Sequence, residues 1–207
     1  MSRSFNFKAL RGKFKTTVVT DELALEESLR LLLSKVNEKL HERGNVPERV
    51  VALDIEKSFC SASYGMVKER VVVLMLGVEN DCLIIHLTHF EKLPTSLSKF
   101  LDLSDITFVG VSIKSNLADL QRDYGIQCRN GVDLGVFAAA VRDSTGISAY
   151  PLPCIVRCSN IDFCKPADVA FSEWGTSMLS EKQIEHASLV VHKTFKIVEQ
   201  LWQRYLS

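Results

Sequence analysis

The chain contains 207 residues, of which 46% are hydrophobic and 24% are charged. These proportions are typical of a folded domain and exclude a disordered or low-complexity protein. Basic and acidic residues each number 25, so the formal net charge is zero. A nucleic-acid partner would therefore need a local basic patch, because the overall charge does not attract it. We expect one domain over 1–207.

Targeting and redox state can also be addressed from composition. No apolar run approaches the roughly 20 residues that span a bilayer, so no membrane partner is expected. The first residues lack the apolar centre of a secretory signal. We therefore expect an intracellular protein, cytoplasmic or nuclear, with reduced cysteines. Cys154, Cys158 and Cys164 lie close together, but their spacing fits no common zinc signature.

In chain order, the pattern of apolar residues predicts alternating strands and helices. Strands are expected at 16–20, 49–55, 71–78, 82–87 and 106–113. Helices are expected from Asp21 to a stop at Gly44 and Pro47, and then at 94–101, 117–124, 134–141 and 180–205. The turn at 79–81 predicts a hairpin between the third and fourth strands. Residues 1–15 are interpreted as a basic arm or an edge strand, and 144–166 as irregular. This order predicts an α/β sheet covered by helices.

Two carboxylates, Asp54 and Glu56, stand at the end of the second apolar strand. Alternate residues of a strand share a face, so both side chains are expected to project the same way. Neighbouring carboxylates repel one another unless cations neutralise them. A pair of divalent metals about 4 Å apart does so in many phosphoryl-transfer enzymes, and Mg²⁺ suits carboxylate and phosphate oxygens. The alternative interpretation is a strand end with two solvated acids.

Later motifs add to this pair: Phe108-Val-Gly-Val-Ser-Ile-Lys-Ser-Asn, then Ser172-Glu-Trp, then His186-Ala-Ser-Leu-Val. Over 50–201, this succession resembles the 3′–5′ exonuclease domains of the DEDD superfamily, in the branch of ribonuclease D and the Werner-syndrome exonuclease. It is most similar to the small plant RISC-interacting clearing 3′–5′ exoribonucleases. The resemblance implies a ribonuclease H-like fold, with a mixed sheet and helices on both faces. It also implies hydrolysis of single-stranded RNA from its 3′ end with Mg²⁺, for which Mn²⁺ would substitute, and Argonaute or RISC as a partner.

The acid set of the family is incomplete in this chain. Asp54 and Glu56 match the first motif, whose acids hold the metals. The second motif carries Asn116 where the family has aspartate. In the third motif, Y-A-x-x-D-A, His186 replaces the tyrosine and Val190 replaces the aspartate. Two of the four carboxylates are absent.

Three accounts of this incomplete site remain open. In the first, the chain is an inactive module that binds RNA or a silencing protein. In the second, Asn116 and Asp119 substitute for the missing acids, and His186 is a general base, because its pKa suits proton transfer near neutral pH. In the third, a neighbouring subunit completes the site within a ring-shaped homo-oligomer such as a hexamer, as the resemblance to the plant enzymes implies.

The segment after the carboxylate pair is expected to line the mouth of the groove. Its candidate contacts to RNA phosphates are Lys57, Ser58, Lys68 and Arg70. The alternative is a solvated loop.

Other notable side chains receive structural interpretations. Asp133 is expected to cap a helix. His86 and His89 are expected on the surface, and His192 is expected to be exposed. The two tryptophans are expected to pack in the core or at a subunit contact.

Overall fold

The computed structural model describes residues 2–9, 12–38, 49–61, 67–142, 148–161, 164 and 166–206. Its strands are β1 (Ser2–Ala9), β2 (Gly12–Val19), β3 (Val50–Ser61), β4 (Val67–Val78), β5 (Asp81–His86), β6 (Thr107–Gly110) and β7 (Gly131–Asp133). Its α-helices are α1 (Glu22–Glu38), α2 (Thr95–Leu101), α3 (Ile113–Tyr124), α4 (Leu134–Val141), α5 (Leu152–Ser159), α6 (Ala167–Ala170) and α7 (Glu181–Leu206). A short 3-10 helix covers Leu87–His89.

The strands form one mixed sheet in the order β1-β2-β5-β4-β3-β6-β7. The pairs β1–β2, β3–β4 and β4–β5 are antiparallel, whereas β2–β5, β3–β6 and β6–β7 are parallel. The predicted hairpin of β4 and β5 is confirmed, and so is the mixed α/β sheet. β6 lies between β3 and β7, as its nearly continuous apolar sequence indicates.

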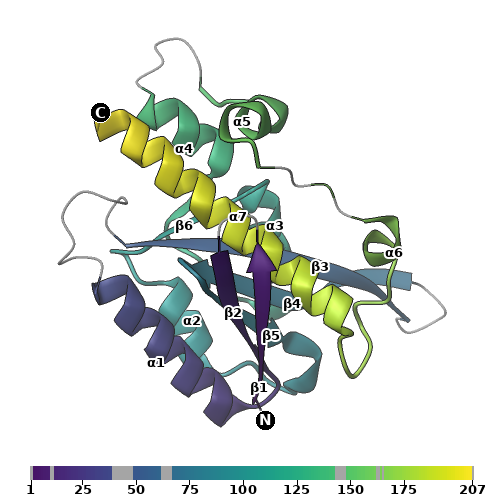
Figure 1. Ribbon diagram of the computed structural model, residues 1–207. Coiled ribbons are helices and arrows are strands. Elements are labelled where there is room, and N and C mark those ends of the chain that lie inside the picture. Colours follow the sequence, from purple (N-terminus) through teal and green to yellow (C-terminus); the bar gives the residue numbers. More distant parts are fainter. Residues whose placement is uncertain are drawn as a thin grey trace.

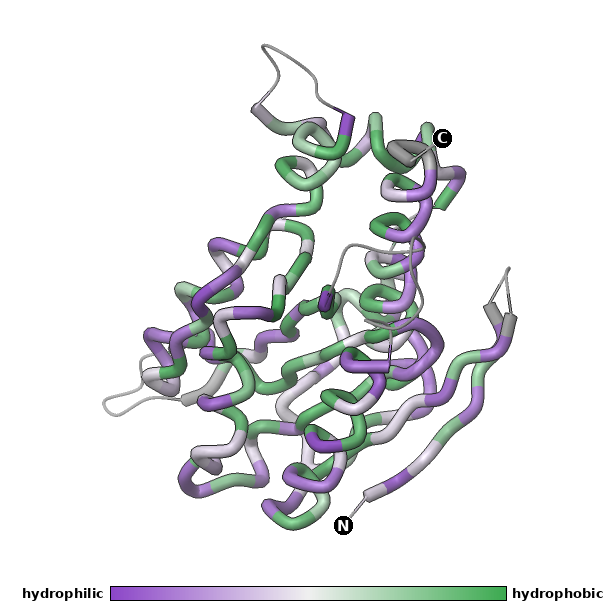
Figure 2. Tube along the Cα trace, turned by 90° about the vertical axis from the view of Figure 1, so that its left-hand side faces the viewer, coloured by the Kyte–Doolittle hydropathy of each residue, from purple (hydrophilic) through white to green (hydrophobic). Residues whose placement is uncertain are grey.

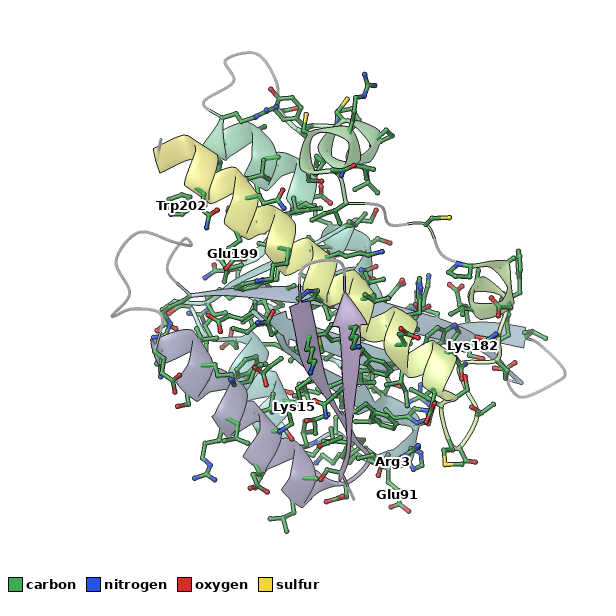
Figure 3. The ribbon with its side chains drawn as sticks, in the orientation of Figure 1. Arg3, Lys15, Glu91, Lys182, Glu199 and Trp202 are labelled. Carbon is green, nitrogen blue, oxygen red and sulfur yellow. The ribbon has the colours of Figure 1, made fainter. Side chains whose placement is uncertain are left out.

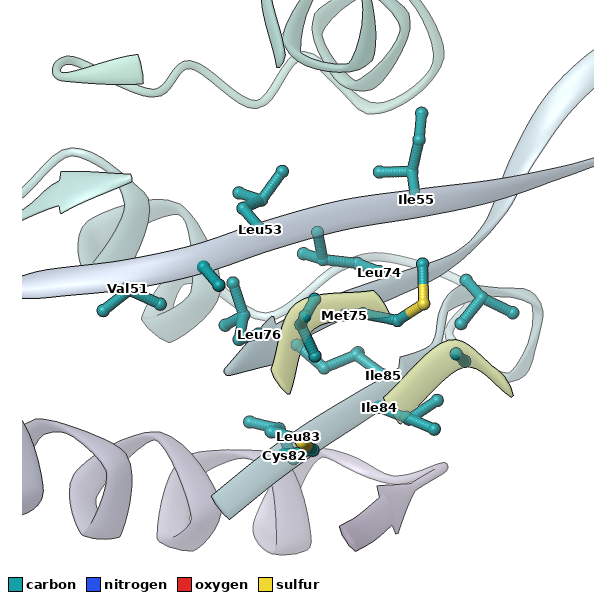
Figure 4. Close-up of a cluster of buried hydrophobic side chains, with 14 of the residues drawn as sticks. Val51, Leu53, Ile55, Leu74, Met75, Leu76, Cys82, Leu83, Ile84 and Ile85 are labelled. Carbon is teal, nitrogen blue, oxygen red and sulfur yellow. The ribbon is translucent and has the colours of Figure 1, made fainter. Parts of the chain in front are cut away.

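Helices cover both faces of this sheet, and α7 runs across one of them (Figure 1). Gly77 of β4 lets α7 approach closely, because an added Cβ would lie only 2.9 Å from the Cβ of Val191. On the other face, Phe100 of α2 packs edge-on against Phe108 of β6. The buried aliphatic side chains of β3, β4 and β5 fill the space between these layers (Figure 4). Figure 2 shows hydrophobic and hydrophilic residues interleaved along the helices and strands, as expected for elements with one buried side.

The amino-terminal segment is an edge strand, one of its two predicted alternatives. β1 pairs antiparallel with the whole of β2, which extends from Gly12 to Val19 instead of covering only 16–20. β2 in turn pairs with β5 and packs against α7, where Thr16 Oγ1 donates to Ser188 Oγ at 2.8 Å. The hairpin of β1 and β2 is therefore part of the folded core.

Three predicted boundaries are wrong. The expected strand at 106–113 ends at Gly110, because Ser112 adopts a left-handed φ of 52° and turns the chain into α3. Within 144–166, α5 forms at Leu152–Ser159, since Pro151 and Pro153 fall at its start, where a helix tolerates proline. The segment 57–70 is not a loop in its described part, because β3 continues to Ser61 and β4 begins at Val67. The predicted stop of the first helix at 44–47 lies outside the described residues.

The predicted exposure of two histidines is also wrong. His192 is only 4% exposed, because Phe14 of β2 stacks on its ring at 4.9 Å and Nδ1 lies 2.9 Å from Glu79 O. His86 is 1% exposed at the end of β5, whereas His89 lies on the surface as expected. Burial lowers the pKa of both buried imidazoles to about 4. Of the two tryptophans, Trp174 is buried as predicted.

Of the helices in the described ranges, none is both long and apolar enough to cross a bilayer.

Candidate active site

The carboxylate pair lies on the face of β3 that α7 covers. Asp54 is opposite Met75 of β4, and Glu56 is opposite Val73. These positions share a face with Gly77, which contacts α7, because side chains alternate along a strand. Both acids are half-buried. The predicted common face of the pair is therefore confirmed.

Asn116 bonds directly to Asp54. Its Nδ2 donates to Asp54 Oδ1 at 2.9 Å, and the backbone amide of Ile55 donates to the same oxygen at 2.9 Å. Asn116 reaches this position from the first turn of α3, which the turn at Ser112 directs towards the end of β3. The amide thus places a hydrogen-bond donor where a second carboxylate would place a negative charge.

Lys57 projects towards α3, on the opposite face of β3 from Glu56. Its Nζ lies 2.7 Å from Glu69 Oε2 and 3.2 Å from Asp119 Oδ2. The hydrogen bond with Glu69 is the main cause of the raised pKa of Lys57, and Asp119 adds to it. Arg122 also pairs with Asp119. Asp119, predicted as a substitute ligand, is therefore engaged by two cations on the α3 side of the sheet.

A β-bulge separates the acid positions from the outer part of the hairpin. Glu56 is opposite Val73 and Lys57 is opposite Val71, so Val72 is the extra residue. α3 satisfies backbone groups at this irregularity: Val71 N donates to Asp123 Oδ2 at 2.9 Å, and Tyr124 Oη donates to Val71 O at 2.5 Å. Burial raises the pKa of Asp123, but the hydrogen bonds from Arg122 and Val71 outweigh it and leave this pKa lowered.

The loop before α7 contacts β3 just beyond Glu56. Ser58 Oγ donates to Glu173, and this bond lowers the pKa of that carboxyl group. Gln183 of α7 holds the loop through bonds from Nε2 to Ser172 Oγ and Glu173 O, each 3.1 Å long. Sequence reasoning missed both Glu173 and Gln183. The pattern Ser180-x-x-Gln183 before an apolar helix was a usable signal, since it is typical of a capping box.

The remaining predicted site residues differ in their surroundings. His186 is buried on α7, and Val190 follows one turn later, half-buried. Asp133 caps α4 as predicted, accepting from Gly135 N at 2.9 Å. In the part of the chain that the structure describes, no three histidine, cysteine or acidic side chains are close enough to hold a metal ion.

The predicted phosphate contacts are divided between the two faces of the hairpin. Lys57 pairs with Glu69 and Asp119, and Ser58 donates to Glu173. Lys68 Nζ lies 4.0 Å from Asp123 Oδ1, and the Arg70 guanidinium lies 4.7 Å from the centre of the Tyr124 ring. Both basic side chains lie at exposed positions.

A separate open pocket of about 460 Å³ lies along the outer side of α3. Its walls include Lys114, Gln121, Cys128 and Arg129, and Arg129 pairs with Asp102 at 3.2 Å. The residues predicted for the site are absent from its lining.

Comparison with known proteins agrees with this fold. A family model described as 3′–5′ exonuclease matches residues 17–205. A 3′–5′ exonuclease of Drosophila ananassae is 29% identical over 163 residues, which cover 74% of this chain and 44% of the relative. One from Arabidopsis thaliana is 24% identical over 208 residues, covering 96% of this chain and 67% of the relative. The chain therefore spans less than half the length of the Drosophila protein.

Solved structures show the same architecture. The catalytic core of RRP6 from Trypanosoma brucei superposes with a TM-score of 0.66 at 15% identity, covering 93% of this chain and 47% of that one. RNase D of Escherichia coli gives 0.65 at 16% identity, covering 91% and 44%. The ribonuclease H-like fold that the sequence predicts is thus confirmed. Since the family model spans most of the chain, the protein belongs to the 3′–5′ exonuclease domain family, within the DEDD superfamily that its motifs resemble.

Proposed function

We propose that this chain hydrolyses single-stranded RNA from the 3′ end, using a divalent cation held by Asp54 and Glu56. The observation that carries the proposal is the position of both carboxylates on one half-buried face of β3 in a 3′–5′ exonuclease domain. RNA as the substrate is supported by the neighbour RNase D, which is described as an exoribonuclease involved in structured RNA processing.

The donor set fits one cation better than two. Mg²⁺ keeps several waters and is commonly bound by one or two carboxylates together with substrate phosphates. Asp54 and Glu56 supply such a pair. Among the described residues, the two other acid positions of the family offer no carboxylate to a second metal, because Asn116 is an amide that turns its NH₂ towards Asp54 and Val190 has no polar side-chain atom. Crystal structures of a related fold, the EXD2 exonuclease domain, are described as soaked in Mg and in Mn with GMP, which supports a divalent cation here, Mg²⁺ or Mn²⁺.

Each residue of the site has a distinct role in this proposal. When bound, the cation would stabilise negative charge developing on the scissile phosphate. Asp54 and Glu56 bind it, and Asn116 fixes the orientation of Asp54 through the 2.9 Å hydrogen bond. His186 accepts a proton from the attacking water, since a neutral imidazole is a suitable base near pH 7.

The cellular setting follows from the resemblance to the plant clearing exoribonucleases. We propose that the substrates are RISC cleavage fragments and that Argonaute is a partner. The protein would form a ring-shaped homo-oligomer in the cytoplasm. Light scattering of the purified chain tests the oligomer directly, because a ring has several times the mass of one chain.

A ladder assay tests the hydrolysis. Purified protein is incubated with 5′-labelled single-stranded RNA and Mg²⁺, and the products are separated by length. The wild type should shorten the RNA stepwise from its 3′ end, whereas Asp54→Ala and Glu56→Ala should leave it intact. Glu91→Ala is the matched control, because Glu91 is an exposed acid in the loop before α2 (Figure 3). Equal shortening by wild type and Asp54→Ala would refute the proposal.

The second candidate function is RNA binding without hydrolysis. The bond between Asn116 and Asp54 favours it, because an amide donor partly neutralises the carboxylate in the absence of any metal. Tight RNA binding by the wild type, combined with intact RNA in both Mg²⁺ and Mn²⁺, would establish this alternative.

A further inference from the structure

The outer part of the β3–β4 hairpin carries two basic residues on the same face as the acid pair. Ser58 is opposite Arg70, and position 60 is opposite Lys68. Paired residues of neighbouring strands share a face, and alternate residues of β3 lie on one face. The backbone register therefore places Arg70 and Lys68 on the face of Asp54 and Glu56, while their charged ends extend along β4 to Tyr124 and Asp123 of α3. Successive positions on this face are about 7 Å apart, so Arg70 lies one step beyond Glu56 and Lys68 two steps beyond.

We propose that Arg70 and Lys68 form a phosphate track for the single-stranded nucleic acid whose 3′ end lies at Asp54 and Glu56. This inference rests on the proposed function, because it takes the acid pair as the end of the path. The track binds the backbone, so it accepts RNA and DNA strands alike.

Arg70 is positioned in advance for this role. Its guanidinium lies over the ring of Tyr124 at 4.7 Å, and the Tyr124 hydroxyl is itself bonded to Val71 O. Among the described residues, no carboxylate forms an ion pair with Arg70. Stacking leaves the N–H groups at the guanidinium edge directed outwards, where they suit bidentate contact with a phosphate. Because the side chain is already held, less entropy is lost when a strand binds.

Lys68 extends the track towards the tip of the hairpin. Its side chain is 61% exposed, and its Nζ is 4.0 Å from Asp123, which is the limit of an ion pair. Because the ammonium itself is largely exposed and this separation is long, the ion pair contributes little, and the ammonium can move to a phosphate at small cost.

The other two predicted phosphate contacts are less suitable. Lys57 faces α3 and is held by Glu69 and Asp119. Ser58 is committed to Glu173, whose negative charge disfavours a phosphate on the β3 side. The path is therefore confined to the β4 side of the hairpin.

The track predicts a specific change in salt dependence. Binding of a 5′-fluorescein single-stranded RNA is followed by anisotropy in EDTA, which prevents metal-dependent cleavage, at a series of KCl concentrations. Each phosphate contact to a single strand contributes about 0.7 to the slope of log affinity against log salt. Arg70→Gln and Lys68→Gln should each lower this slope by about 0.7, and Arg70→Lys should keep the slope but bind more weakly.

Two control variants separate the track from general effects. Lys99→Gln removes an exposed charge on α2, and Phe59→Ser changes a 71% exposed side chain of β3 on the opposite face. Both should keep the wild-type slope. An unchanged slope in Arg70→Gln and Lys68→Gln, an equal fall in Lys99→Gln, or no binding by the wild type would overturn the track. Cleavage in Mg²⁺ is scored separately. Slope losses without cleavage leave the track standing and refute the hydrolase, and the reverse result refutes the track.

Discussion

Replacing Asn116 with aspartate should turn a hydrogen-bonded pair into a repelling pair. In the wild type, Asn116 Nδ2 donates to Asp54 Oδ1 at 2.9 Å. In Asn116→Asp, an oxygen that carries negative charge takes the place of that donor. Without metal, the folded state should therefore lose stability, whereas a divalent cation between the two carboxylates should restore it.

The size of the effect follows from the geometry. A hydrogen bond to a charged group is worth about 1.5–3 kcal/mol. Two unit charges about 4 Å apart repel by about 1 kcal/mol in water and about 4 kcal/mol near a protein surface. Both residues are half-buried, so we expect Asn116→Asp to lose about 3 kcal/mol near pH 7.5. For a chain of this length, that loss lowers the melting temperature by about 6–12 °C. A cation at about 100 times its Kd returns about 2.7 kcal/mol.

Thermal unfolding in EDTA and in Mg²⁺ measures both effects. Asn6→Asp is the control, because it makes the same substitution at an exposed position of β1. The reasoning fails if Asn116→Asp melts with the wild type in EDTA, or if Mg²⁺ does not raise its melting temperature more than that of Asn6→Asp.

Three further outcomes are expected. His186→Ala should slow cleavage, and His186→Tyr should retain part of the rate. If cleavage is equally fast in the wild type and in both variants, His186 is not the base. The folded-state pKa values of His86 and His192, about 4, lie below the unfolded value of 6.5, so their contribution to stability is complete above pH 6.5 and is lost as the pH falls towards 4. At about 1.4 kcal/mol per pH unit, the stability lost over this range is about 3.5 kcal/mol for each histidine. Urea unfolding of His192→Phe across pH should therefore show a flatter profile than that of the wild type. Ser112→Gly should add about 1 kcal/mol to the free energy of unfolding, because glycine adopts the φ of 52° without strain; lower stability in urea would contradict this.

Features that depend on neighbouring residues in the chain were predictable from the sequence. The alternation of Asp54 and Glu56 on a strand, the turn between β4 and β5, and the Asp133 cap each need only a few residues. The end of α3 at Gly125 also depends only on nearby residues. Glycine adopts the left-handed φ of 69° there, and its amide donates to Gln121 O.

Features that depend on distant residues were not predictable. His192 is buried by Phe14, which lies near the other end of the sequence. Asp119 looked available as a ligand because it follows Asn116 by one helical turn. Its engagement with Lys57 depends on a contact between residues 62 positions apart. A single sequence carries no signal for such pairs.

The hydrogen bond between Thr16 and Ser188 has a consequence for synthesis of the protein. It joins residues 172 positions apart, within the layer where β2 packs against α7. A nascent chain therefore emerges from the ribosome with the inner face of its first hairpin uncovered, and keeps it so until α7 has been made. Contacts of such long range slow folding. Shortening the chain before residue 188 would leave Thr16, Phe14 and the α7-facing side of β2 exposed to other chains, so such fragments should aggregate rather than fold.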